Sequence, residues 1–114
     1  MCHVLIIEDE LLIAMMIEAL VEDEGATSCD IATTEREAIA AALAHPPDVI
    51  TSDVQLREGT GPQAVAKITE CLGERPVIFI TGNPEICKPR LPSSVLLTKP
   101  LSKTALHEAF HGYC

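Results

Sequence analysis

Four short apolar runs in this 114-residue sequence end in residues that could do chemistry. The polar residues that follow them are Glu8-Asp9, Asp53, Thr81 and Lys99. Three carboxylates with one hydroxyl and one ammonium group form an open set of hard ligands, which suits Mg²⁺ because this ion keeps waters and leaves room for phosphate. With the carboxylate charge balanced, Lys99 and Thr81 could hold phosphoryl oxygens while Asp53 serves as in-line nucleophile. These residue types indicate phosphoryl transfer.

Strands and helices that alternate along the chain would position these residues. Apolar, β-branched runs predict strands at 4–7, 27–31, 49–50, 76–80 and 95–97, and helices are expected at 10–24, 34–44, 62–72 and 102–113. Residues 84–92 contain three prolines and allow at most one or two helical turns. This alternation requires right-handed crossovers and a mostly parallel, three-layer α/β sheet. Because the carboxyl ends of parallel strands meet at one edge, the polar residues should share a site.

Helix boundary signals support these elements. Thr34-x-x-Glu37 is a capping box, and Ser102 can cap the last helix. Gly25 and Gly73 follow the first and third helices as stop residues. The strand at 27–31 is more polar than the others, which predicts a place at the sheet edge.

The first predicted helix carries more large apolar side chains than one face can bury. A stripe of Leu12, Met16 and Leu20, with Ile13 and Ile17 beside it, is expected to face the core. The apolar cluster at 11–17 either packs deeply or leaves an exposed patch for a partner.

Composition predicts one cytoplasmic domain, residues 1–114. The net charge of −9, from 8 basic and 17 acidic residues, argues against nucleic acid and anionic membranes as direct partners. No apolar run is long enough for a signal peptide or a membrane span. The five cysteines are odd in number and lack CxxC spacing, so we expect reduced thiols and neither disulfide nor zinc site. The four histidines are scattered, and none is expected to be a ligand or base.

The order Glu8-Asp9, Asp53, Thr81-Gly82 and Lys99-Pro100 resembles the receiver domain of bacterial two-component response regulators over essentially the whole chain. The resemblance implies a flavodoxin-like (βα)5 fold with strand order 2-1-3-4-5. It implies that Asp53 takes a phosphoryl group from a histidine kinase or phosphotransfer protein. It further implies Mg²⁺ held by Asp9, Asp53, the Gln55 backbone carbonyl and, through water, Glu8. Thr81 would be the switch hydroxyl, Lys99 would pair with the phosphoryl group, and the bond before Pro100 would be cis.

Two positions depart from the usual receiver pattern. Leu96 stands where the family carries Tyr or Phe, so the usual relay from Thr81 to a partner surface is not expected. The run 79–82, Phe-Ile-Thr-Gly, is similar to the signature of the FATGUY subgroup of stand-alone receivers, although Asn83 and Pro84 differ from its continuation. Gln55 and Asn83 would help set the rate of a slow self-dephosphorylation.

Each site residue also has a plain structural interpretation. Asp53 could cap the loop after its strand, Thr81 could be an ordinary β-branched strand residue, and Lys99 could be a surface lysine. Glu10 is expected to be a solvated residue at a helix N-terminus. The spacing of Asp53 with Asp9 and Lys99 favours the functional interpretation.

Three functions remain open at this point. The first is a phosphorylation-dependent switch that is not an enzyme. The second is a phosphohydrolase with an aspartate nucleophile, but Gln55 occupies the place of the general acid such enzymes need. The third is a receiver-like binding module that works without phosphorylation, suggested by Leu96 and the proline-rich segment.

Overall fold

A computed structural model describes residues 1–82, 94–110 and 112–114. Five strands and four helices lie in this part of the chain. The strands are β1 (His3–Ile7), β2 (Ser28–Ala32), β3 (Val49–Ser52), β4 (Val77–Thr81) and β5 (Val95–Thr98). The helices are α1 (Leu11–Asp23), α2 (Glu35–Ala44), α3 (Gly61–Leu72) and α4 (Lys103–Phe110). The prediction for 84–92 falls outside the described residues.

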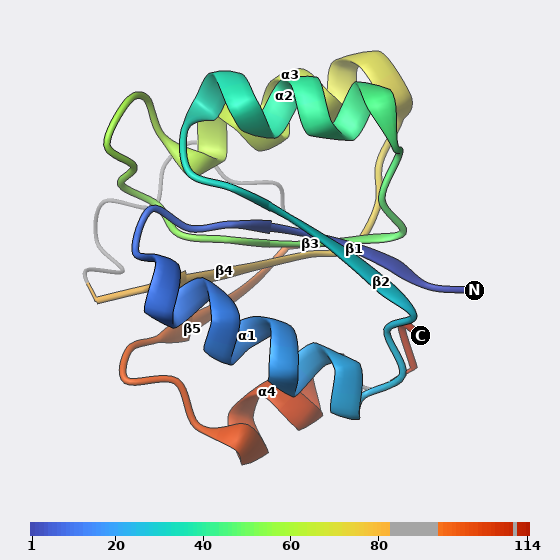
Figure 1. The fold of residues 1–114 in the computed structure, drawn as a ribbon, viewed down its shortest axis with the longest axis vertical. Helices are drawn as coiled ribbons and strands as arrows, with labels where there is room; N and C mark the ends of the chain where they lie inside the picture. Colours follow the sequence, from blue (N-terminus) through green and yellow to red (C-terminus); the bar gives the residue numbers. More distant parts are fainter. Residues whose placement is uncertain (83–93, 111) are drawn as a thin grey trace.

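The strands form one parallel sheet in the order β2-β1-β3-β4-β5, which confirms the predicted flavodoxin-like topology. Figure 1 shows α2 and α3 on one face of the sheet and α1 and α4 on the other. The polar β2 lies at a sheet edge, as predicted. The loops that follow β1 and β3 therefore lie at one edge of the sheet, as the site requires.

Alternate side chains of each strand supply the two halves of the core. Leu5 and Ile7 of β1 pack toward α2 and α3, whereas Val4 and Ile6 pack toward α1 and α4. All five residues of β1 are buried, which is typical of a strand inside a parallel sheet.

The predicted core stripe of α1 is wrong for Leu12 and Met16, although Ile17 is buried and Ile13 and Leu20 pack against the core. The buried residues of this helix are Ala14, Ile17 and Val21, while Leu12 is 84% exposed and Met16 is 44% exposed. The helix therefore buries a face with small and branched side chains, and large apolar side chains face the solvent. Deep packing of the whole 11–17 cluster is likewise excluded.

Most helix boundaries agree with the sequence signals. Gly25 follows the C-cap of α1 with a φ of 108°, and Gly73 caps α3 with a φ of 89°. Thr34 accepts a hydrogen bond from the Glu37 amide, as a capping box requires, but the Glu37 carboxylate accepts from Thr33 instead of the cap residue. Helix α4 ends at Phe110, earlier than predicted.

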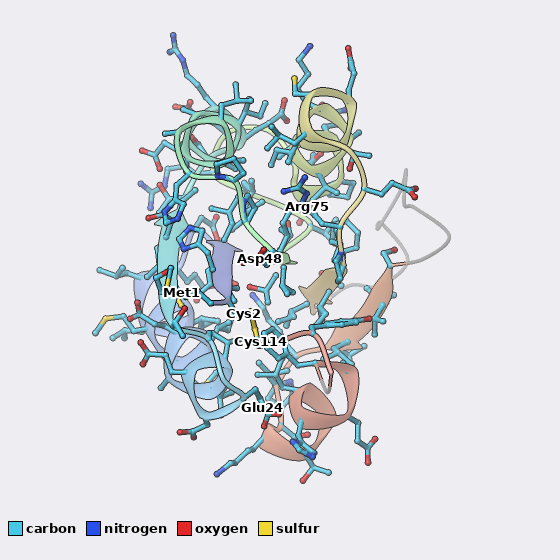
Figure 2. The ribbon with its side chains drawn as sticks, turned by 90° about the vertical axis from the view of Figure 1, so that its right-hand side faces the viewer. Met1, Cys2, Glu24, Asp48, Arg75 and Cys114 are labelled. Carbon is cyan, nitrogen blue, oxygen red and sulfur yellow. A yellow bond between two sulfur atoms is a disulfide. The ribbon has the colours of Figure 1, made fainter. Side chains whose placement is uncertain are left out.

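The expectation that all cysteines are free thiols is wrong. Cys2 and Cys114 are joined by a disulfide that connects the start of β1 to the end of the chain (Figure 2). Cys29 and Cys71 are free. No sequence spacing signalled this pair, because its 112-residue separation depends on where the two ends of the fold lie.

No helix among residues 1–82, 94–110 and 112–114 combines the length and hydrophobicity that crossing a bilayer would need.

Candidate functional site

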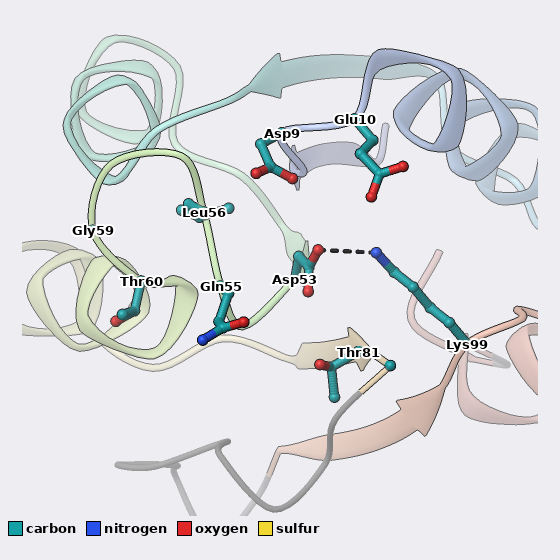
Figure 3. Close-up of a pocket in the computed structure, with 10 residues that line it drawn as sticks. Asp9, Glu10, Asp53, Gln55, Leu56, Gly59, Thr60, Thr81 and Lys99 are labelled. Atoms are coloured by element: carbon teal, nitrogen blue, oxygen red, sulfur yellow. Dashed lines mark hydrogen bonds and ion pairs between the residues drawn. The ribbon is translucent and has the colours of Figure 1, made fainter.

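An open, acidic pocket of about 690 Å³ lies at the carboxyl edge of the sheet (Figure 3). Five expected site residues line it together, namely Asp9, Asp53, Gln55, Thr81 and Lys99. Its full lining is Asp9, Glu10, Asp53, Gln55, Leu56, Gly59, Thr60, Thr81, Gly82 and Lys99. Strand topology thus brings residues from distant parts of the sequence into one site.

Two backbone hydrogen bonds fix the position of Asp53. Its amide donates to the Ile7 carbonyl at 2.8 Å, and its Oδ1 accepts from the Val54 amide at 2.7 Å. The whole residue is 8% exposed. Figure 3 shows the carboxylate directed into the pocket, with Oδ2 facing Lys99. Asp53 therefore presents one oxygen that is held by the backbone and one that is held only by a side chain.

Lys99 joins the two buried carboxylates of the site. Its Nζ lies 2.9 Å from Asp53 Oδ2 and 3.1 Å from Glu8 Oε1. Burial alone would lower the pKa of Lys99, but its hydrogen bonds to Asp53 and Glu8 and their charges outweigh burial and raise the pKa above its ordinary value. The ammonium group is consequently charged at neutral pH.

Glu8 lies beneath the pocket. It has no exposed surface, and its Oε2 accepts from the Glu10 amide at 3.1 Å. Burial raises the pKa of Glu8 to about 7, and the charge of Asp53 adds to this, whereas the Glu10 amide and Lys99 lower it. Glu8 can therefore change its charge near neutral pH.

The donor atoms of the pocket fit a hard divalent cation. Carboxylate oxygens of Glu8, Asp9 and Glu10 lie within 4.8 Å of one another. Glu8 Oε1 contacts Lys99 and accepts no hydrogen bond from any other described residue. An all-oxygen, acidic set that is open on one side suits Mg²⁺. Glu10, expected only as a solvated helix residue, is exposed but also lines this pocket.

The remaining predicted residues differ in how closely they approach the pocket. Thr81 is 3% exposed at the end of β4, and Gln55 is exposed on the loop after β3. Leu96 is half-buried and packs against the core on the α2 and α3 side, so it does not line the pocket. The bond between Lys99 and Pro100 is cis, as the resemblance implied. Asn83 lies outside the described residues.

The loop after β3 completes the pocket with residues that the sequence reasoning did not single out. Leu56 and Thr60 line the pocket, and Gln55 forms an antiparallel bridge with Thr60. Glu35, at the start of α2, accepts from the Thr60 amide at 3.0 Å. The glycines at 59 and 61 were the available signal, because both mark a tight turn beside Asp53.

The histidines are less scattered than expected. The rings of His3 and His45 stack with centroids 3.5 Å apart, and both lie near Asp30. His107 pairs with Glu24 at 2.8 Å, and the position of His111 falls outside the described residues. The expectation that the histidines are scattered is therefore wrong for His3 and His45.

Comparisons with known proteins agree with the fold. The family model of the response regulator receiver domain matches residues 4–111. The phyllosphere-induced regulator PhyR of Methylorubrum extorquens is 43% identical over 102 residues, which cover 86% of this chain and 38% of that protein. The solution structure of the PhyR receiver domain of Erythrobacter litoralis is 35% identical with a TM-score of 0.81, covering 96% of this chain and 89% of that one.

A crystal structure of an anti-anti-sigma factor PhyR mutant from Bartonella quintana is 36% identical with a TM-score of 0.82. It covers 96% of this chain and 46% of that chain. The chain thus spans less than half the length of these PhyR proteins. The matched family model spans nearly the whole chain, and the chain belongs to the response regulator receiver domain family.

Proposed function

We propose that this receiver domain is a phosphoacceptor, and that Asp53 accepts a phosphoryl group from a phosphohistidine of a histidine kinase or phosphotransfer protein. The observation that carries the proposal is the contact of the Asp53 carboxylate with Lys99 beneath an open pocket. The surrounding acidic and hydroxyl groups support it.

The two oxygens of Asp53 take different parts in the proposed reaction. The backbone bond from Val54 holds Oδ1, so Oδ2, which only Lys99 holds, is the oxygen free to attack phosphorus. The new O–P bond forms as the P–N bond of the phosphohistidine breaks, and the donor imidazole nitrogen keeps the electron pair. Lys99 then exchanges the carboxylate oxygen for a phosphoryl oxygen, which keeps its charge paired.

Glu8, Asp9 and Asp53 would hold Mg²⁺, with the Gln55 carbonyl as the further ligand that the family resemblance implies. When bound, the ion neutralises the charge that builds up on the phosphoryl oxygens. Asp9 lies at the pocket surface and Glu8 beneath it, so the two can contact a cation from different sides. The exposed Gln55 would influence how fast water reaches the phosphoryl group.

Phosphorylation of Asp53 would switch the domain between two states. It would not be a step in the turnover of a substrate. A phosphoryl group adds about −1.5 to −2 charges, by analogy with other phosphorylated residues, and draws Thr81 and Lys99 toward it. In this proposal a protein partner reads the resulting surface. One PhyR relative is an anti-anti-sigma factor, so an anti-sigma factor is one class of partner.

A binding module that ignores phosphorylation is the second candidate. The observation in its favour is Leu96, which packs against the core and offers no ring to carry a signal outward. Partner affinity that is equal with and without a phosphoryl analogue would support it. A phosphohydrolase is less well supported, because the exposed amide of Gln55 cannot donate a proton as a general acid.

The test is intact mass after incubation with acetyl phosphate, with Mg²⁺ and then with chelator. We expect one phosphoryl adduct that requires Mg²⁺ and is absent in Asp53→Asn. The matched control is Asp23→Asn, which removes an exposed carboxylate at the end of α1 and should leave the adduct unchanged. An adduct that persists in Asp53→Asn would contradict the proposal.

A further inference from the structure

A second polar cluster lies toward the amino ends of the strands, opposite the acidic pocket at their carboxyl ends. His3 begins β1, Asp30 belongs to β2, and His45 caps the carboxyl end of α2. In Figure 1 the start of β1 and the end of α2 lie on the right, away from the loops that follow β1 and β3. The cluster is therefore separate from the proposed phosphoryl site.

One oxygen of Asp30 is common to both imidazoles. Asp30 Oδ2 lies 3.0 Å from His3 Nε2 and 3.9 Å from His45 Nδ1. One donor atom of each of the three side chains lies within 4.8 Å of the other two. Three convergent donors from three different elements form a preorganised set.

The ring of His3 is fixed in the orientation that such a set needs. His3 is 6% exposed, and its Nδ1 lies 2.7 Å from Ser28 Oγ. Because the Asp30 carboxylate can only accept, the neutral His3 ring carries its proton on Nε2, and Nδ1 accepts from the Ser28 hydroxyl. When a cation takes the place of the Nε2 proton between the ring and the carboxylate, the ring carries its proton on Nδ1 instead, which then donates to Ser28 Oγ and holds the ring in place.

We propose that His3, Asp30 and His45 bind one Zn²⁺ ion. Two imidazole nitrogens and one carboxylate oxygen are the ligands of many three-residue zinc sites, and they leave a fourth position to water. Imidazole ligands also select against Mg²⁺, which prefers oxygen.

His45 has to make the largest movement when the ion binds, while His3 Nε2 and Asp30 Oδ2 separate slightly. Ligands at the zinc distances of 2.0–2.2 Å are about 3.4 Å apart around a tetrahedral ion, between the two distances that the Asp30 oxygen makes here. An ion lies in the plane of each ring that binds it, so the stacked His45 ring must tilt away from His3. The His45 side chain is 57% exposed, which gives it the room to do so.

Thiolate ligands are not part of this site. Cys29 lies between Ser28 and Asp30 in β2, so its side chain points to the other face of the sheet.

The experiment titrates the untagged, disulfide-intact protein with Co²⁺, a spectroscopic substitute for Zn²⁺, while excess Mg²⁺ fills the acidic pocket. We expect one Co²⁺ per chain, with the visible bands of a tetrahedral nitrogen and oxygen site and no thiolate charge-transfer band, and displacement of Co²⁺ by Zn²⁺. His45→Gln and Asp30→Asn should weaken binding by more than about tenfold, and Ser28→Ala by about tenfold.

Two further variants locate the ion. His107→Gln removes another exposed histidine that pairs with a carboxylate, and it should leave Co²⁺ binding unchanged. Asp53→Asn should also leave Co²⁺ binding unchanged, because the acidic pocket lies at the carboxyl ends of the strands, away from this cluster. The proposal is overturned if no Co²⁺ binds beside Mg²⁺, if His45→Gln binds Co²⁺ as tightly as the parent protein, or if Asp53→Asn abolishes binding. Circular dichroism of each variant verifies that it is folded.

Discussion

At the scale of single residues, Glu8 decides the charge balance of the acidic pocket. It is fully buried, and Lys99 is shared between it and Asp53. Above the Glu8 pKa of about 7, two carboxylates share one ammonium group, and below it the charges of Asp53 and Lys99 match. A bound cation would restore the balance at higher pH.

The raised pKa of Glu8 makes the stability of the metal-free protein depend on pH. A carboxyl group whose pKa rises on folding opposes folding once it ionises. This cost is absent below pH 4.5, where Glu8 is protonated in both states, and is complete above about pH 7. The raised pKa of Lys99 also stabilises the folded protein. This contribution is lost only when the pH rises through the folded-state pKa of Lys99. It is therefore constant over the pH range in which Glu8 titrates.

We predict that Glu8→Gln stabilises the metal-free protein at pH 8 and has little effect at pH 4.5. The shift from 4.5 to about 7 corresponds to a gain on the order of 3 kcal/mol at pH 8, because the amide carries no charge to desolvate. Urea unfolding in the presence of chelator at the two pH values measures it. A variant that is less stable than the parent at pH 8 would show that ionised Glu8 contributes favourably.

The positions of the polar residues were predictable from the sequence, but their burial was not. Asp53, Thr81 and Lys99 had to meet because parallel strands end at one edge. Glu8 and Asp9 are neighbours after the same strand, yet Glu8 is buried and Asp9 lies at the pocket surface. Which of two adjacent acids turns inward depends on the local backbone, and no residue pattern encodes it.

At the scale of elements, the turn between β3 and α3 holds Asp53 in place. The amide of Gly61 donates to the Val54 carbonyl at 2.8 Å, and Ser52 Oγ donates to the Asp53 carbonyl at 2.7 Å. A Cβ atom on Gly61 would overlap both the Asp53 carbonyl oxygen and the Ser52 hydroxyl. Glycine is thus required at this position by close approach of the backbone.

We predict that Gly61→Ala destabilises the protein by at least about 2 kcal/mol, because the backbone of Asp53 must shift to make room. Gly82→Ala is the matched control, since a Cβ there meets no described residue within 4 Å, and it should change the free energy of unfolding little. Urea denaturation of both variants compares them. Equal stability of the two would mean that the turn relaxes without cost.

The face that α1 buries could not be deduced from its composition. Leu12, Met16 and Leu20 recur every four residues and so predict a core stripe. Ala14, Ile17 and Val21 have an equally valid helical spacing, and they form the buried face. Two apolar stripes compete in this helix, and the smaller side chains allow it to lie close to the sheet.

At the scale of the whole molecule, both ends of the chain meet. The disulfide of Cys2 with Cys114 closes a loop that spans almost the entire sequence, and the Cys2 amide also donates to Thr27 Oγ1 at 2.9 Å. A covalent link of this length restricts the unfolded chain, whatever its effect on the folded one. Predicting it requires knowing that the chain returns to the start of β1 after α4, which is a property of the topology.

We predict that Cys114→Ser lowers the free energy of unfolding by about 2–4 kcal/mol. Cys114 is exposed, so the substitution removes the link without changing the core. Reductant should destabilise the parent protein by a similar amount and leave Cys114→Ser unchanged. Cys71→Ser, which changes a free and exposed thiol, should retain the stability of the parent. A reductant effect that survives in Cys114→Ser would contradict the assignment.

The measurement that tests the central proposal most directly is the position of the phosphoryl group. Protein phosphorylated from acetyl phosphate with Mg²⁺ is reduced with borohydride, which converts an acyl phosphate to the alcohol, and is then digested with trypsin. Cleavage after Arg36 and Arg57 isolates one peptide that contains both Asp48 and Asp53. We predict that fragmentation finds the reduced side chain at Asp53 alone. Reduction at Asp48 or in another peptide, or no reduced residue in folded protein, would contradict the phosphoacceptor account.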